Sequence, residues 1–204
     1  MTLSLSQEQK SIRFARMGIL LGLLSGLLWA LDGLLVEHAQ KFAPFNINTE
    51  GGLFILLAAL CAGLHDLFAT LFVTLYNFRA GRLKEVGRSL VSRPGRSVIL
   101  GSLIGASCGM GAYMAALQLA PSAYVMPITA LYPGVAVVMA VFFLKEKVKL
   151  PACLGIFICI IGAAVIGYTP PETGDSVSGN LFSLGIAFAF IATLGWGTEG
   201  VLVT

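Results

Sequence analysis

Two segments of the sequence repeat one pattern, WALDGLLV at residues 29–36 and WGTEGVLV at residues 196–203. The offset between the tryptophan, the acid, the next glycine and the last valine is constant at 167 residues (196 − 29). A carboxyl near the middle of a membrane span costs on the order of 2.5–3.5 kcal/mol. Acids at the same place in two apolar runs, Asp32 and Glu199, therefore predict a functional site. The alternative is that both acids are structural partners of hydroxyls or waters.

The composition predicts an integral membrane protein. Hydrophobic residues make up 57% of the chain and charged residues 11%, whereas a soluble domain carries about a quarter of its residues as charges. Several runs reach roughly 20 apolar residues, the length that crosses a hydrocarbon core as a helix. These runs are continuous rather than alternating, which favours helices over a barrel. We expect an all-α, polytopic transmembrane helix bundle.

The sequence predicts six membrane spans, at residues 17–36, 51–76, 97–119, 123–144, 150–168 and 181–204. Residues 1–16 are expected to form a cytoplasmic tail, and residues 169–180 an extracytoplasmic linker. A cleaved signal peptide is the competing interpretation of the first run, but the sequence after it lacks a small residue at the −3 position. The last predicted span is still apolar at the end of the sequence.

Basic residues are placed very unevenly. Every Lys and Arg except Lys41 falls in the tail, in residues 77–96 or in residues 145–149. The positive-inside rule then puts the N-terminus in the cytoplasm, and we assign the protein to the plasma (inner) membrane. Each repeat would contain five spans, and because this number is odd, the second copy of the pattern would enter the membrane from the opposite side. This is the inverted topology of secondary transporters.

Spaced glycines predict close helix contacts. Gly101, Gly105 and Gly109 recur every four residues and share one helix face, and Gly155 and Gly162 do so across two turns. Such small residues let a neighbouring helix approach closely. We expect all five to be structural.

The fourth predicted span contains two prolines, Pro127 and Pro133. Each removes a helix hydrogen bond and kinks the helix, which frees a carbonyl. A kinked helix with Tyr124, Thr129 and Tyr132 beside free carbonyls is a candidate cavity wall. A static bend is the alternative.

The four cysteines lie inside predicted spans, and no spacing suits a zinc site or a redox motif. No nucleophile and base pair and no phosphate-binding loop is visible either. We therefore expect no metal, no cofactor and no enzymatic activity.

Three further motifs carry a resemblance to a known family. They are LQLAPSA at 117–123, LYPGV at 131–135 and FLKEK at 143–147, followed by Gly155 and Gly162. In this order they resemble the closing half of an EamA-type repeat of the drug/metabolite transporter superfamily. That family pattern has a short turn before the fourth span and a proline within the fourth span. A glutamate follows the fourth span, and the fifth span contains spaced glycines.

The resemblance covers residues 17–168 as one five-helix repeat and residues 181–204 as the first helix of an incomplete second repeat. It implies a ten-span permease with both termini in the cytoplasm and a central cavity, and substrates that range over amino acids, metabolites, sugars and drugs. Trp29 with its small neighbours also resembles the family's first span. Glu146 is expected to order the turn at the membrane surface. The pair His65-Asp66 departs from the pattern.

The intramembrane acids are the candidate substrate or proton sites. Asp32 lies about 22 Å along the first span at the helical rise, nearer the outer face, whereas Asp66 and Glu199 are expected nearer the inner face. His65, the immediate neighbour of Asp66, is expected to serve a different contact. Other candidate site residues are Trp29, Trp196, Tyr124, Thr129 and Tyr132.

These features predict a secondary transporter, a permease or exporter, that works by alternating access and is coupled to protons or to exchange. The alternative is a non-transporting membrane sensor or scaffold with structural acids. Expected partners are a small-molecule substrate, the lipid bilayer, and the missing half of the protein or a second copy in a dimer, with no nucleic acid. A repeat of this length implies about 130–140 further residues.

Overall fold

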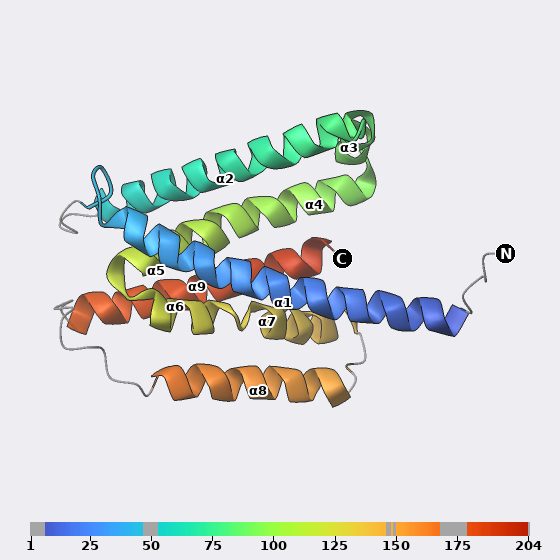
Figure 1. Ribbon diagram of the computed structural model, residues 1–204. Coiled ribbons are helices and arrows are strands. Elements are labelled where there is room, and N and C mark those ends of the chain that lie inside the picture. The colour runs from blue at the N-terminus through green and yellow to red at the C-terminus, as the bar shows by residue number, and fades with distance from the viewer. Residues whose placement is uncertain (1–6, 47–52, 146–147, 149, 168–178, 204) are drawn as a thin grey trace.

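The computed structural model describes residues 7–46, 53–145, 148, 150–167 and 179–203. All regular elements in these ranges are helices (Figure 1), which confirms the all-α bundle. The elements are α1 (Gln7–Gln40), α2 (Leu53–Arg79), α3 (Leu83–Leu90), α4 (Arg93–Ile104), the π-helical segment η2 (Gly105–Met110), α5 (Gly111–Leu119), α6 (Ser122–Thr129), α7 (Tyr132–Met139), the π-helical segment η3 (Ala140–Leu144), α8 (Leu150–Gly167) and α9 (Gly179–Val203).

Five helical stretches are long and apolar enough to cross a membrane: Ser11–Gln40, Leu53–Arg79, Arg93–Leu119, Ser122–Leu144 and Gly179–Val203. The fifth predicted span corresponds to a shorter apolar helix, Leu150–Ile166. Helix α1 begins at Gln7, inside the segment expected to be a tail, and extends past Val36. No proline or glycine interrupts residues 7–16, so nothing local stops the helix there.

Helix α9 lies at the centre of the bundle. It packs against α4, η2, α5, α6 and α7, and it runs in the direction opposite to α1 (Figure 1). Helix α8 stands on one side of the bundle, with its main contacts to α6. The two copies of the repeated pattern thus lie on antiparallel helices.

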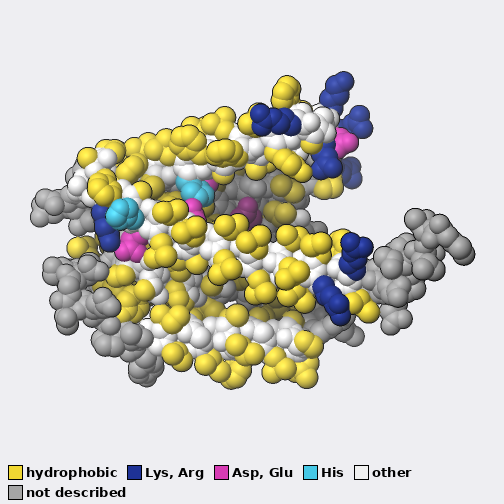
Figure 2. Space-filling view, viewed as in Figure 1, with side chains coloured by type: hydrophobic (Ala, Val, Ile, Leu, Met, Phe, Trp, Pro, Cys, Tyr) yellow, Lys and Arg dark blue, Asp and Glu magenta, His cyan; other side chains and the backbone are white. Residues whose placement is uncertain are grey.

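Basic side chains gather at one end of the molecule, over the start of α1, the end of α2, and α3 (Figure 2). Lys41 lies at the other end of α1, where its Nζ is 3.3 Å from Oε1 of Glu37. Large apolar side chains cover much of the remaining surface, as a chain surrounded by lipid requires.

The fourth predicted span is broken once. Helix α6 continues through Pro127, and Ala130 and Leu131 separate it from α7, which has Pro133 in its first turn. A proline is favourable in the first turn of a helix, because its nitrogen would lack a partner there in any case. The span is thus interrupted just before Pro133, whereas the helix is continuous at Pro127. The Thr193 hydroxyl of α9 lies 3.1 Å from the Ile128 carbonyl beside the break and 2.8 Å from the Ala189 carbonyl of its own helix, so its single proton is shared between these two acceptors.

The spaced glycines fall into two groups. Cβ atoms built at Gly101, Gly105 and Gly109 would meet side chains of α9, so these glycines lie directly against that helix. Nothing lies within 4 Å of a Cβ at Gly155 or Gly162. Among the described residues, no neighbour packs closely against α8 at these two glycines, so their packing role stays a prediction. Glu146 and most of the expected linker lie outside the described residues.

Candidate functional site

His65 of α2 lies between two acids. Its Nε2 is 3.4 Å from Oδ1 of Asp32 on α1, and its Nδ1 is 3.2 Å from Oδ1 of Asp66 on its own helix. The two ring nitrogens of one imidazole can each address a different carboxylate. The three side chains are between 29% and 41% exposed. One histidine thus links two intramembrane acids and ties α1 to α2.

Two expectations about this cluster are wrong. His65 and Asp66 do contact each other, because their side chains turn toward one another although neighbouring helix positions point in different directions. Asp32 and Asp66 lie at a similar depth rather than toward opposite faces, since one ring touches both. Asp66 lies near the middle of α2 (Leu53–Arg79) rather than toward its inner end.

Glu199 of α9 joins the same region from the second copy of the pattern. A cavity of about 310 Å³ is lined by both Asp66 and Glu199, together with residues of α2, α4, η2 and α9. The Ser102 hydroxyl lies within hydrogen-bonding reach of the Glu199 carboxylate. A Cβ at Gly105 would overlap that carboxylate, so a glycine is needed here for the acid to sit against η2.

Three aromatic rings surround Trp196. Its ring centroid is 5.0 Å from that of Trp29, 5.4 Å from Tyr113 and 6.1 Å from Tyr132. Trp29 and Tyr113 are also in contact, with centroids 5.7 Å apart. The rings come from α1, α5, α7 and α9, so this cluster joins four helices at one point.

A second cavity of about 360 Å³ opens at these rings. It is lined by Trp29, Tyr132, Trp196, Glu199, Gly200 and Val203. Trp196 and Glu199 line both this cavity and the cavity that contains Asp66. The aromatic cluster and the acids therefore form one continuous candidate site.

Tyr113 belongs to this site but was not among the sequence-based candidates. The side chain is completely buried, and its hydroxyl has no hydrogen-bond partner among the described residues. That hydroxyl lies 2.7 Å from the position of a Cβ built at Gly33, next to Asp32. Tyr113 continues the four-residue spacing that ends at Gly109, and this continuation was the available sequence signal.

Tyr124 and Thr129 lie elsewhere. The Tyr124 ring packs against Phe182 with centroids 5.3 Å apart. Thr129 is completely buried, and its hydroxyl donates to the Met126 carbonyl at 3.0 Å. Neither residue lines the two cavities beside the acids. Both precede the break in the fourth span, whereas Tyr132 follows it and reaches the site.

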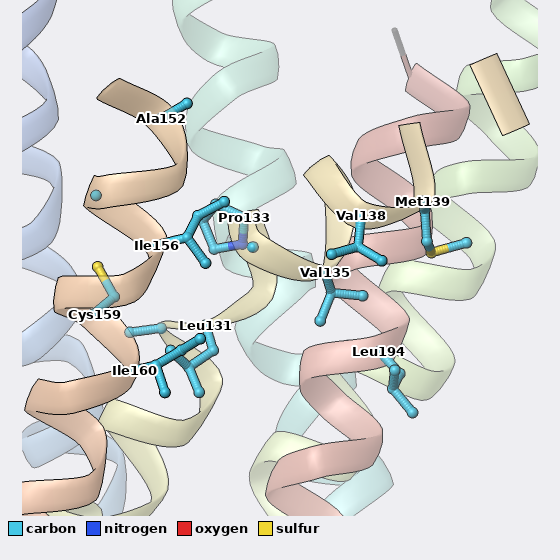
Figure 3. A pocket seen from close by; sticks show the side chains of 13 residues that line it. Leu131, Pro133, Val135, Val138, Met139, Ala152, Ile156, Cys159, Ile160 and Leu194 are labelled. Carbon is cyan, nitrogen blue, oxygen red and sulfur yellow. The ribbon is translucent and has the colours of Figure 1, made fainter. Parts of the chain in front are cut away.

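A third cavity, an apolar groove of about 660 Å³, lies between α7 and α8 (Figure 3). Side chains of Leu131, Pro133, Val135 and Ile156 point into it, and Leu194 of α9 closes one side. Among the described residues, no acidic or basic side chain lines this groove. It is separate from the site at the acids.

Comparison with known proteins adds a family match. Residues 16–168 match the sequence profile of the EamA-like transporter family. Protein LicB of Haemophilus influenzae is 30% identical over 185 residues, which cover 91% of this chain and 57% of that protein. The chain therefore spans less than two thirds of the length of this relative. No solved structure matches.

Proposed function

The chain belongs to the EamA-like transporter family of the drug/metabolite transporter superfamily, and from that premise we propose that it acts in a secondary transporter for small metabolites, amino acids or drugs. The observation that carries the proposal is the gathering of four ionisable side chains, Asp32 and Glu199 from the two copies of the repeated pattern and His65 and Asp66 from α2. His65 contacts both aspartates, and Asp66 and Glu199 line one cavity. Intramembrane ionisable groups that face one another across helices are typical of substrate and proton pathways.

The mechanism we propose is alternating access. In inverted-repeat transporters the substrate lies between the two halves, which rock around it. Asp32 on α1 and Glu199 on α9 are equivalent acids on antiparallel helices and would exchange exposure to the two sides. When the transporter switches between its two exposures, an intramembrane carboxylate is most easily carried along if it is protonated or paired with a cationic substrate. His65 can hold or pass that proton because it contacts both Asp32 and Asp66.

The membrane arrangement follows from the charge distribution. We propose a plasma (inner) membrane protein whose N-terminus lies in the cytoplasm, with the basic end of the bundle on that side. Residues 17–168 would form the first five-helix repeat, residues 169–180 an extracytoplasmic linker, and residues 181–204 the first helix of the second repeat. The rest of the second half would come from further chain or from a second copy. We expect no enzymatic activity.

The test is flux of a metabolite panel into sealed vesicles that contain the full-length protein, with and without a pH gradient. We expect at least one substrate whose flux responds to the gradient. Asp32→Asn keeps the shape of the side chain but removes its titration, and should abolish this response. Glu85→Gln is the matched control, because Glu85 lies on exposed α3 outside the spans.

Two outcomes would contradict the proposal. The absence of flux for every substrate, from a folded protein, would favour a membrane sensor or scaffold with structural acids. Flux with an unchanged pH response in Asp32→Asn would remove this acid from the coupling mechanism.

A further inference from the structure

The short helix α3 carries exposed apolar side chains on one face and basic side chains beside them. We propose that α3 lies in the headgroup region of the bilayer, with its apolar face against the acyl chains, and that the basic residues around it bind the headgroups of anionic phospholipids. This inference does not depend on transport. It gives the segment between α2 and α4 a lipid partner.

The apolar face of α3 is a stripe of three large side chains. Leu83, Val86 and Leu90 are spaced by three and four residues, which places them along one side of a helix. They are 40%, 40% and 51% exposed, so the packing of α3 on α2 and α4 leaves much of the stripe uncovered. Exposure of apolar surface to water is unfavourable in proportion to its area. A helix with one apolar and one charged face is typical of helices that lie in the plane of the membrane interface.

The position of α3 in the chain holds it at the membrane surface. It lies between the end of α2 at Arg79 and the start of α4 at Arg93, and both neighbours belong to stretches long enough to span the membrane (Figure 1). With eight residues it is about 12 Å long, so it is too short to cross the bilayer itself. Tyr76 and Phe78, in the last turn of α2, are 65% and 66% exposed. The apolar stripe of α3 therefore continues the lipid-facing surface of α2.

The basic residues around α3 are not neutralised by the described part of the chain. Residues 79–96 contain a single acid, Glu85. The basic residues of this segment are Arg79, Arg82, Lys84, Arg88, Arg93 and Arg96. The ion pairs among the described residues lie elsewhere, at Glu37 and at His65. Unpaired Lys and Arg near a bilayer surface attract anionic lipids, and the planar guanidinium of arginine matches the geometry of a phosphate group. This composition favours an anionic phospholipid over a zwitterionic one.

The test places a tryptophan on the stripe, Leu90→Trp, and measures the quenching of its fluorescence by lipids with brominated acyl chains. The purified full-length protein is reconstituted in phosphatidylcholine nanodiscs that contain equal fractions of brominated phosphatidylglycerol or brominated phosphatidylcholine. The signal of Trp29 and Trp196 is subtracted with the unchanged protein. We expect quenching by both lipids, and about threefold stronger quenching by phosphatidylglycerol. No quenching would place the stripe in water, and equal quenching would remove the preference for anionic headgroups; either result would overturn the proposal.

Charge variants test whether the basic residues carry this preference. Lys84 and Arg88 are four residues apart and extend from one side of α3, next to the stripe. In the Leu90→Trp protein, Lys84→Gln combined with Arg88→Gln should move the ratio of quenching by the two lipids toward one. Glu85→Gln on the same helix removes no positive charge and is the matched control, which should keep the ratio at about threefold or above. All three side chains are exposed, so thermal unfolding should change little. If the double variant keeps the ratio of the control, the basic residues do not bind the headgroups and the proposal fails.

A second probe position separates α3 from the rest of the surface. Phe42→Trp lies at the opposite end of the bundle, where Phe42 is 58% exposed and the neighbouring Lys41 is paired with Glu37. Its quenching should be equal for the two lipids. A preference of the same size at this position would show a general enrichment of anionic lipid and would overturn the assignment to α3. Nanodiscs carry the same lipids in both leaflets, so the outcome depends neither on the proposed orientation nor on transport.

Discussion

Trp29 and Trp196 meet edge to face, with ring centroids 5.0 Å apart and planes inclined at 78°. The two residues occupy the same position in the two copies of the repeated pattern, and their helices α1 and α9 run in opposite directions (Figure 1). Equivalent residues of an inverted repeat contact each other only near the axis that relates the two copies. The contact therefore joins the two copies of the pattern at their tryptophans, each of which is followed three residues later by an acid, Asp32 or Glu199.

The first prediction concerns orientation in the membrane. Single cysteines at Phe42 and Glu85, in a protein whose native cysteines are replaced by alanine, should react differently with an impermeant thiol reagent added to intact cells. Phe42→Cys should be labelled, because Phe42 is 58% exposed and lies at the end of the bundle opposite the basic cluster. Glu85→Cys should be labelled only after the membrane is permeabilised. The reverse pattern would invert the proposed topology.

The second prediction concerns the link between α1 and α2. Asp32→Asn and His65→Gln should be non-additive in the free energy of unfolding, with an interaction energy of about 0.5–3 kcal/mol, because their side chains are in contact. The measurement is a double-mutant cycle of unfolding in mixed micelles. As the control pair, Asp32→Asn and Glu85→Gln should be additive within about 0.5 kcal/mol. Additivity in both cycles would mean that the histidine does not link the helices.

The third prediction concerns the contact between η2 and α9. Gly109→Ala should lower the free energy of unfolding by about 1–3 kcal/mol, because its Cβ would lie 2.5 Å from the Trp196 ring. Gly22→Ala on α1 is the matched control, since nothing lies within 4 Å of a Cβ there. This control should be neutral or slightly stabilising, because alanine favours a helix more than glycine does. Thermal unfolding in detergent compares the two, and equal stability would show that α9 does not pack this closely on η2.

The fourth prediction concerns the broken fourth span. Thr193→Val should destabilise the protein by about 0.6 kcal/mol, a typical value for a hydrogen bond between membrane helices, because it removes the hydroxyl whose proton is shared between the Ile128 carbonyl and the Ala189 carbonyl of α9. Thr198→Val is the control, since the Thr198 hydroxyl bonds to the Leu194 carbonyl of its own helix at 2.8 Å and reaches across to α7 only at the weak acceptor Met139 Sδ, 3.6 Å away. In chemical unfolding, Thr193→Val should lower the free energy of unfolding more than Thr198→Val does. A larger loss for Thr198→Val would contradict the proposed support of the break.

The class of the fold and most helix positions could be predicted because they are local properties. A run of about 20 apolar residues predicts a membrane helix without any knowledge of its neighbours, and the fixed offset between the two patterns identified Asp32 and Glu199 as equivalent. The helix boundaries were less accurate at α1, where a polar stretch continues the helix because no residue stops it. The composition marks where the chain changes from polar to apolar residues. The helix itself extends as far as its backbone hydrogen bonds continue, which is further.

The contacts within the site depended on tertiary structure. Whether Asp32 meets His65 is decided by how α1 and α2 each pack on α5, since both helices contact α5. Tyr113 reaches Trp196 and Trp29 only because η2 and α9 approach each other through Gly109. Gly155 has the same spacing signature as such contact glycines but faces open space, because α8 packs mainly on α6. A sequence repeat shows which residues are equivalent, but only the packing of helices that are distant in the sequence determines which residues are in contact.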